Sequence, residues 1–267
     1  MFGRRPDATL VRDAPALRRF MPFISPRRNE SLVYFAQEIE VDRALAFIES
    51  RNQQRPSDRK ITLFHLLLYA VARGIHQRPR LNRFTKGGRL WQRDGLWITF
   101  SAKMRLDDDA PLVTVKRRVE PEAPFETLVD DLLDSLRTRR SGRETTTDTE
   151  VSLLLRIPPW LTRLTLWLVD GADALGLLPR SMIDSDPMYA SIFVANLGSV
   201  GLEAGYHHLW EHGTCPMFCV MGKVRRDADG RRRMTVKYSY DERIEDGLYA
   251  AGALERIKGM IESPEKL

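Results

Sequence analysis

Cysteine is scarce in this 267-residue sequence, which contains only Cys215 and Cys219. Two cysteines do not make a disulfide framework, and no second pair is present to complete a zinc site. This scarcity is typical of proteins from a reducing compartment. We therefore expect a cytoplasmic protein without a metal centre.

Long apolar runs are also missing. No stretch of about 18 uncharged apolar residues is present, so we expect no transmembrane segment. The first residues, up to Arg19, lack the apolar run of a signal peptide. Hydrophobic residues nevertheless make up 43% of the sequence, which is enough for a core and argues against disorder.

Neither positive nor negative residues are in large excess. The 42 basic and 36 acidic residues give a formal net charge of +6, with local arginine-rich runs at 137–143 and 231–233. Such a spread is typical of a solvated surface, and the alternative is a rim that favours phosphorylated ligands. We expect small-molecule partners and no nucleic acid.

Hydrophobic periodicity predicts one α/β domain over residues 1–267, a two-layer sandwich with a mixed β-sheet. Residues 1–17 read as a loose arm, and the Asp229-Gly230 turn predicts a hairpin. The predicted strands are 33–42, 90–103, 111–119, 190–195, 217–224 and 234–240, and the predicted helices are 41–53, 62–76, 125–136 and 245–261.

Residues 141–188 read as an insertion, whose apolar part is 151–179. This part has three possible roles: contact with a membrane surface, a lid over a substrate channel, or a subunit contact. Within residues 157–169 only Arg163 interrupts a charge-free run, whereas interfacial helices are usually rich in Lys and Arg. We therefore favour a lid or a subunit contact. The apolar face comprises Leu161, Leu164, Leu166, Trp167 and Leu168.

The run from Tyr238 to Gly247 reads Tyr-Ser-Tyr-Asp-Glu-Arg-Ile-Glu-Asp-Gly. It resembles the Ser-Tyr-Asp-His-Arg-x-x-Asp-Gly signature of dihydrolipoamide acyltransferase cores and the shorter His-x-x-x-Asp-Gly of chloramphenicol acetyltransferases. Segments 39–42, 78–84 and 193–198 resemble other parts of this family in the same order. No lipoyl-bearing domain is recognisable, so we do not expect a full multienzyme-complex subunit.

The resemblance implies transfer of an acyl group from a coenzyme A thioester to a thiol or hydroxyl acceptor. It also implies a homotrimer with sites between neighbouring subunits. In this family a histidine is the base and a Ser or Thr hydroxyl stabilises the oxyanion. Here Glu242 occupies the base position and Ala195 the hydroxyl position, in a pocket region with Asn196 and Gly198.

The structural part of the signature is retained as Asp246 and Gly247. The resemblance implies that Asp246 pairs with Arg28 and thereby shapes the loop. Glu242 has three possible roles: a general base or acid, a ligand-orienting group, or a carboxylate that salt-bridges Arg243 or another arginine in the pocket. A carboxylate with an unperturbed pKa of about 4.3 is a weak base unless burial raises that value.

Three of the five histidines lie in the segment 206–215. His207 or His208 is a candidate for a relocated base. A metal site with Glu211 or Cys215 and a packing role at a trimer contact are the alternatives. His65 and His76 lie on the helix predicted at 62–76, where we expect core histidines with satisfied hydrogen bonds.

Two functions therefore remain open at this point. One is a coenzyme A-dependent acyltransferase with a rearranged site that uses Glu242, His207 or His208. The other is a trimeric scaffold or binding protein, a possible pseudoenzyme, that has lost both the imidazole and the hydroxyl. The fold alone supports neither.

Overall fold

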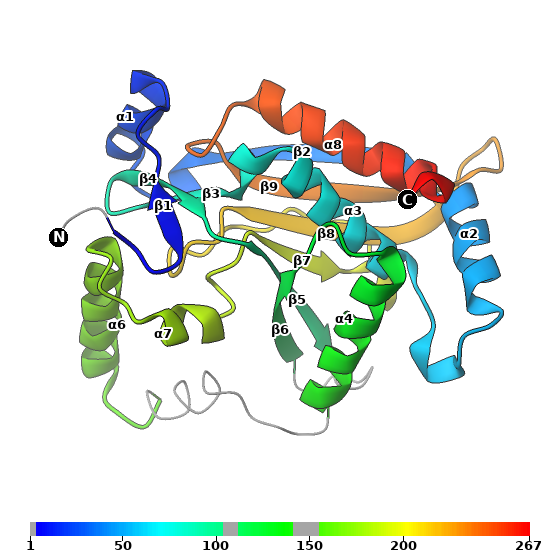
Figure 1. Cartoon of the computed structure of the whole chain (residues 1–267), viewed down its shortest axis with the longest axis horizontal. Coiled ribbons are helices and arrows are strands. Elements are labelled where there is room, and N and C mark those ends of the chain that lie inside the picture. The colour runs from blue at the N-terminus through cyan, green and yellow to red at the C-terminus, as the bar shows by residue number, and fades with distance from the viewer. Residues whose placement is uncertain (1–3, 104–111, 141–154) are drawn as a thin grey trace.

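A six-stranded mixed sheet is the centre of the computed structural model, which describes residues 4–103, 112–140 and 155–267 (Figure 1). Strand β7 is parallel to its neighbours β8 and β5, and the other pairs are antiparallel. The predicted mixed α/β fold is therefore confirmed. In spatial order the strands are β2 (Leu32–Glu40), β9 (Arg232–Asp241), β8 (Met217–Arg226), β7 (Ile192–Asn196), β5 (Leu96–Lys103) and β6 (Leu112–Val119).

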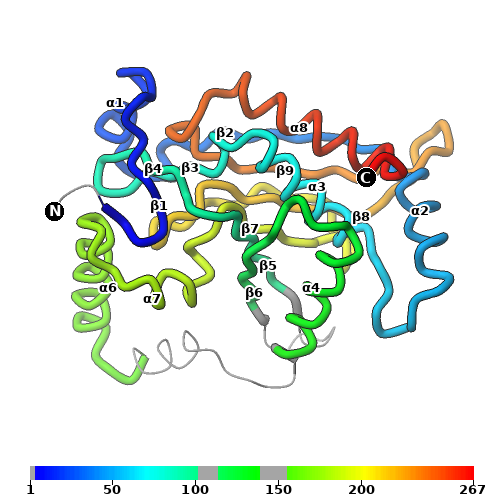
Figure 2. The backbone as a smooth tube through the Cα atoms, in the orientation of Figure 1, coloured from blue at the N-terminus to red at the C-terminus, as the bar shows by residue number. Residues whose placement is uncertain are grey.

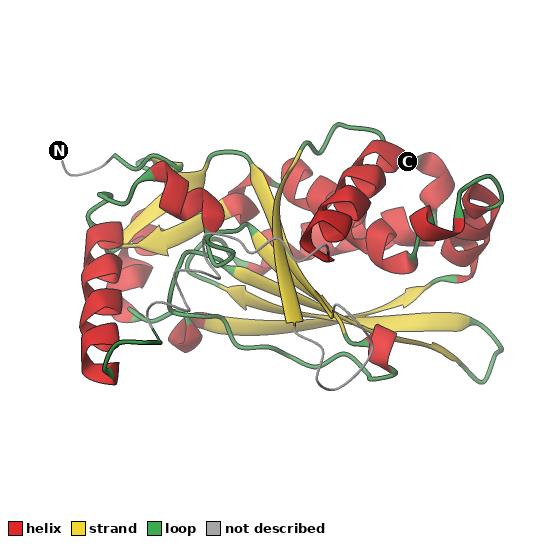
Figure 3. Cartoon of the chain, turned by 90° about the horizontal axis from the view of Figure 1, so that it is seen from below, coloured by secondary structure: helices red, strands yellow, loops and turns green. Residues whose placement is uncertain are grey.

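Helices cover one face of this sheet, as the view from below shows (Figure 3). They are α2 (Asp42–Asn52), α3 (Leu63–Gln77), α4 (Phe125–Arg140) and α8 (Gly247–Glu262). Helix α3 begins with a capping box, in which the Thr62 backbone N–H donates to His65 Nδ1 at 3.1 Å. Eleven of its fifteen residues are buried, as expected for a helix that is apolar almost all round.

Mainly loops cover the other face, and the segment 204–215 contributes most of this layer. A second apolar cluster forms there around the stacked rings of Phe193 and Phe218, whose centroids are 4.8 Å apart. Strands β8 and β9 form a hairpin through the turn at Asp229 and Gly230, which confirms the predicted turn.

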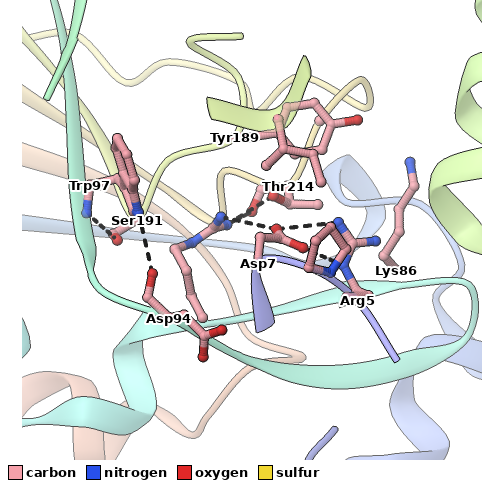
Figure 4. Close-up of polar contacts among 12 residues, drawn as sticks. Arg5, Asp7, Lys86, Asp94, Trp97, Tyr189, Ser191 and Thr214 are labelled. Carbon is pink, nitrogen blue, oxygen red and sulfur yellow. Dashed lines mark hydrogen bonds and ion pairs between the residues drawn. The ribbon is translucent and has the colours of Figure 1, made fainter. Parts of the chain in front are cut away.

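The N-terminal arm is not loose, so that prediction is wrong. Strand β1 (Ala8–Leu10) pairs with β4 (Arg89–Arg93), which pairs in turn with β3 (Arg83–Lys86). The buried Arg5 guanidinium binds Asp7 at 3.0 Å (Figure 4). It also binds Asp173 at 2.7 Å. These ion pairs fix the arm in a way that the breakers Pro6 and Pro15 did not suggest.

Three further helices are α1 (Ala16–Ile24), α6 (Pro159–Ala174) and α7 (Arg180–Ser185). The tube view places α1 and α6 at the same end of the molecule as β1 (Figure 2). Helix α6 is the apolar segment predicted at 151–179, of which residues 151–154 lie outside the described residues. No described helix is long and apolar enough to cross a membrane.

Candidate active site

Glu242 lies directly after β9, in the loop that leads into α8. Its backbone is anchored, because its N–H donates to the Ser31 carbonyl at 3.0 Å and its carbonyl accepts from Arg18. Among the described residues, however, its carboxylate has no hydrogen bond and no ion pair. The suggested salt bridge with Arg243 is absent, because Arg243 holds Asp241 with two hydrogen bonds of 2.8 Å.

Arg28 does not pair with Asp246, so the pairing implied by the resemblance is wrong. Its Nε lies 3.9 Å from Oδ2 of the fully buried Asp241, and its Nη2 donates to the Gly213 carbonyl at 3.0 Å. Asp246 instead caps α8 by accepting the Tyr249 backbone N–H at 2.8 Å. The two aspartates differ because Asp241 ends a buried strand, whereas Asp246 lies at an exposed helix start.

Arg28 also joins two candidate catalytic segments. Its backbone N–H donates to Glu211 at 3.0 Å, and its Nη1 donates to the Trp210 carbonyl. Burial lowers the pKa of Arg28, while the charge of Asp241 opposes that shift. One buried guanidinium therefore braces the 209–213 segment against the end of β9.

Glu245 is a part of the site that sequence reasoning missed. Its buried carboxylate accepts from Arg80 and Arg83, both at 3.2 Å, and Arg18 lies 3.9 Å away. Three arginines thus converge on one carboxylate within the loop. The arginines at 78–83 were visible in the sequence, but their common partner was not. Gly247 has no steric requirement, since a side chain there would meet only Phe35, at 4.0 Å.

Ala195 and Glu242 do not converge within one chain. Ala195 lies opposite Val220 on β8, and Val220 lies opposite Lys237 on β9. Glu242 follows Lys237 by five residues, which at strand spacing corresponds to about 16 Å along the sheet. The two positions that the resemblance compares with a base and a hydroxyl therefore lie toward opposite ends of the strands.

Asn196 and Gly198 have local structural roles at the end of β7. Asn196 Oδ1 accepts the Ser199 backbone N–H at 3.0 Å, which fixes the turn into η4 (Gly198–Val200). A side chain at Gly198 would lie 2.5 Å from the Gly222 carbonyl oxygen of β8. Close packing of two backbones therefore accounts for this glycine.

His207 lies on the loop-covered face of the sheet. Its ring stacks on Phe218 with centroids 4.0 Å apart, and the Trp210 ring is 5.0 Å away. Its Nδ1 lies 2.6 Å from the His208 carbonyl oxygen. A carbonyl can only accept, so Nδ1 carries the proton and Nε2 keeps its lone pair. Burial lowers the pKa of His207, so the ring is neutral at pH 7.

Two other polar side chains of this segment, those of Glu211 and His212, have hydrogen-bond partners. His212 Nε2 binds Asp186 at 2.8 Å, and this bond raises the pKa of His212. Glu211 accepts from the backbone of Arg28 and from Asn29. In the described ranges, no three His, Cys, Asp or Glu side chains are grouped to hold a metal ion. His76, in contrast to the prediction, is exposed and lies 3.4 Å from Glu122, whereas His65 is buried as predicted.

A cleft of about 590 Å³ opens between α1, the tip of the β3–β4 hairpin and α6. Its volume lies in the range of small-molecule sites. Its lining includes Leu166 and Trp167 of α6 together with Arg28 and Arg243. The cleft therefore reaches the two arginines that hold Asp241, one residue before Glu242.

Neither a protein-family model nor a curated protein matches this sequence. Solved structures match almost the whole chain. A truncated catalytic core of the 2-oxoacid dehydrogenase complex from Thermoplasma acidophilum is 15% identical with a TM-score of 0.61, covering 95% of this chain and 98% of that one. A chloramphenicol acetyltransferase is 13% identical with a TM-score of 0.58, covering 95% and 99%.

A dihydrolipoamide acetyltransferase from Azotobacter vinelandii is also similar, with 17% identity and a TM-score of 0.59 over 97% of this chain and 94% of that one. The chain therefore has the fold of chloramphenicol acetyltransferase and of the catalytic domains of dihydrolipoamide acetyltransferases. The resemblance of its 238–247 run to their signature agrees with this fold.

Proposed function

We propose that this protein transfers an acyl group from a coenzyme A thioester to a thiol or hydroxyl acceptor. The fold supports acyl transfer in general, because its neighbours in structure are acetyltransferases. The observation that carries the proposal is the arrangement of His207, which has a fixed tautomer, a neutral ring and an Nε2 without a hydrogen-bond partner among the described residues. A general base needs these three properties.

In this reaction His207 Nε2 accepts the proton of the acceptor's S–H or O–H group. The acceptor sulfur or oxygen then attacks the thioester carbonyl carbon, and the tetrahedral intermediate expels coenzyme A as a thiolate. The imidazolium returns its proton to that thiolate. The backbone carbonyl of His208 orients the His207 ring, so His208 contributes to the reaction through its backbone.

Glu242 takes a different part in this proposal. The backbone of Glu242 is fixed, and within the described residues its carboxylate has no ion pair. This carboxylate is therefore suited to orient an acceptor. About 16 Å separates its position from that of Ala195 along the sheet. Both can border one site only if that site lies between two copies, which supports the expected homotrimer.

A binding protein without catalysis is the second candidate. The observation that favours it is Ala195, which offers no hydroxyl to an oxyanion. Loss of one oxyanion donor lowers the rate by roughly a hundredfold or more. A site with this loss could retain ligand binding while turnover becomes negligible.

The first experiment is a calorimetric titration of the protein with coenzyme A and with acetyl-coenzyme A. Micromolar binding supports the donor site, and absence of binding to a folded protein contradicts the acyltransferase proposal. Release of free coenzyme A is then measured with a panel of thiols and alcohols. We expect His207→Ala to lower kcat by about 10²–10⁴-fold, and Glu242→Gln to act mainly on the KM of the acceptor. Binding without turnover in the parent protein supports the second candidate.

A further inference from the structure

Helix α6 turns its apolar side away from its own chain. Of its sixteen residues only Asp173 is buried, although most of the helix is apolar. Four exposed residues follow the i, i+4, i+7, i+8 spacing of one helix face, namely Trp160, Leu164, Trp167 and Leu168. In a globular protein such a face normally packs on a core. An exposed stripe with two tryptophans therefore indicates a partner outside the fold.

Helix α1 presents a second apolar stripe at the same end of the molecule. Its exposed apolar residues are Leu17, Phe20, Phe23 and Ile24. The cleft described above opens between the two helices, since its lining includes Pro22 of α1 and Trp167 of α6. Figures 1 and 2 show both helices at one end of the molecule. We call the exposed apolar residues of these two helices the α1–α6 surface.

The charges beside this surface are mainly positive. Residues 12–27 contain four arginines and one aspartate, and residues 155–169 contain two arginines and no carboxylate. Arg19 precedes Phe23 by four residues, and Arg163 precedes Trp167 by four, so each arginine borders the apolar stripe of its helix. Both arginines are exposed, and neither has an ion pair among the described residues.

The other charges of the two helices are already bound within the chain. Arg18 of α1 is mostly buried and donates to a backbone carbonyl. Lys86 binds Asp170 of α6 and lies 3.3 Å from the buried Asp173 of the same helix. On α1 and α6, both of which lie within the described residues, the charges left for a partner to neutralise are therefore two exposed cations.

Aromatic rings supply much of the apolar area. The four aromatic side chains of the α1–α6 surface are exposed by 56–70%, which corresponds to roughly 500 Å² if each presents about 200 Å² when free. Single-chain proteins seldom expose more than a few hundred Å² of contiguous apolar surface without a binding role. Tryptophan is enriched where proteins meet lipid headgroups, because its ring is apolar and its N–H is polar.

We propose that the α1–α6 surface docks on a bilayer that contains anionic phospholipids. The apolar stripes enter the boundary between headgroups and acyl chains, and Arg19 and Arg163 reach lipid phosphates from the edges of the stripes. Judged by its sequence, α6 alone has a single cation and is a poor membrane helix. The fold adds α1 with its arginines, so the basic rim that α6 lacks is shared between two helices.

A second copy of the chain is the alternative occupant. A two-fold contact turns the same surface toward itself, so the exposed arginines would meet a surface that offers more cations and no free carboxylate. Burial of unpaired guanidinium groups is unfavourable. A layer of lipid phosphates neutralises them instead. An anionic bilayer therefore accounts for both the exposed rings and the exposed charges.

Docking also brings the cleft to the bilayer. Trp167 belongs both to the α6 stripe and to the lining of the 590 Å³ cleft, and it is 70% exposed. A molecule that enters the cleft between α1 and α6 then arrives from the lipid phase. The docking itself does not depend on acyl transfer, so the two proposals are tested separately.

The main test compares two double variants with matched exposure. Leu164→Glu/Leu168→Glu places two carboxylates on the α6 stripe, at side chains that are 43% and 56% exposed. Val200→Glu/Leu202→Glu places two on the loop after β7, at side chains that are 53% and 55% exposed. Flotation with vesicles of equal amounts of phosphatidylglycerol and phosphatidylcholine measures the membrane-bound fraction of each protein. Vesicles of phosphatidylcholine alone are the lipid control.

We expect the parent to bind the anionic vesicles, the α6 variant to bind them about a hundredfold more weakly, and the variant after β7 to bind as the parent does. Absence of binding in the parent, or equal binding of the α6 variant, overturns the proposal. Sedimentation velocity tests the second-copy alternative. The α6 variant should keep the oligomeric state of the parent, and loss of that state in a variant that is folded by circular dichroism also overturns the proposal.

The contribution of charge is tested with Arg19→Gln/Arg163→Gln. We expect binding to the anionic vesicles to weaken about tenfold to thirtyfold, because each arginine near an anionic surface adds to the attraction. Arg226→Gln/Arg231→Gln is the matched control, since it removes the same charge from exposed positions near the tip of the β8–β9 hairpin. Equal weakening by the two variants would indicate attraction by net charge alone and would contradict docking through this surface.

A fluorescent label locates the docked surface directly. Cys215 and Cys219 are both buried, so Leu164→Cys introduces a single accessible thiol for a nitrobenzoxadiazole maleimide. When anionic vesicles are added, we expect the emission of this label to brighten and to shift to shorter wavelength, and the label at Leu202→Cys to stay unchanged. A shift at both positions or at neither contradicts the proposal. These readouts need neither donor nor acceptor, so a failure of the proposed enzymatic function leaves them unaffected.

Discussion

The two faces of the six-stranded sheet differ in composition and in cover. The face under α3 and α8 is mainly aliphatic, and residues such as Val194, Cys219 and Val236 are fully buried there. The opposite face carries Phe193, Phe218 and a loop with histidines. Neighbouring residues of the same strands, such as Phe193 and Val194, contribute to both faces.

This difference separates the face of the sheet that stabilises the fold from the face that carries the candidate functional groups. The helix-covered face excludes water with regular elements and few polar groups, so it fixes the fold. The loop-covered face keeps a half-buried imidazole beside aromatic rings, and buried charges such as Arg28 hold its loop in place. Functional groups commonly lie on loops that a rigid scaffold positions.

The largest effect is expected at Arg28. Replacement by Ala leaves the buried Asp241 with one arginine fewer and leaves the carbonyls of Trp210 and Gly213 without their donor. We expect a loss of about 3–5 kcal/mol in the free energy of unfolding, measured by urea denaturation. Arg27→Ala is the matched control, because that neighbouring side chain is exposed, and it should change little. An equal effect of both variants would contradict the bracing role of Arg28.

A pair of leucines compares the two faces directly. Leu67 on α3 and Leu209 in the histidine loop are both buried to 1% exposure or less. Truncation to Ala costs about 2–5 kcal/mol, and the cost is smaller where the surroundings can collapse. We expect Leu67→Ala near the upper end and Leu209→Ala near the lower end in urea denaturation. Turnover should show the reverse order, because Leu209 lies two residues from His207. If the same variant shows the larger loss in both stability and turnover, the proposed difference between the two faces is contradicted.

The next effect concerns His65 on the helix-covered face. Burial, reinforced by the charge of Arg55, lowers the pKa of His65 to about 4. Protons then bind the unfolded chain more strongly, so the stability contributed by the neutral ring is present above pH 6.5 and is lost as the pH falls toward 4. The loss is about 3 kcal/mol at most. We expect His65→Gln to flatten the acid limb of a plot of unfolding free energy against pH, and an unchanged limb would contradict the assignment.

The smallest effect has the opposite sign and lies on the loop-covered side. The hydrogen bond to Asp186, opposed by burial, raises the pKa of His212. Its stabilisation is fully present below pH 6.5 and is lost as the pH rises above that value. We expect a small loss of stability between pH 6 and 8 in the parent, removed in His212→Gln. If His65→Gln and His212→Gln changed the same limb, the two faces would not differ in the proposed way.

Several features of the fold were predictable from sequence because they depend on local patterns. The apolar run at 62–76, the alternating strands and the Asp229-Gly230 turn each predicted an element that the structure contains. The folded N-terminal arm was not predictable in this way. Its order depends on Arg5 reaching Asp173, which lies 168 residues away in the sequence.

The candidate site shows the same division. The motif at 238–247 correctly indicated the acyltransferase fold, yet it gave the wrong partner for Arg28. Motif spacing records which residues are near in sequence, whereas the choice between Asp241 and Asp246 depends on which carboxylate is buried beside the guanidinium. The roles of Glu242 and His207 remain predictions, and the turnover assays above decide between them.

The sequence by itself determined the class of fold, the order of the main elements and the side-chain chemistry available at Glu242 and Ala195, because residue identity and hydrophobic period are local properties. Only the tertiary structure decided that these two positions lie about 16 Å apart along the sheet, that His207 stacks on Phe218, and that the apolar side of α6 faces outward. These facts depend on strand register and on packing between distant segments, which a linear pattern does not encode.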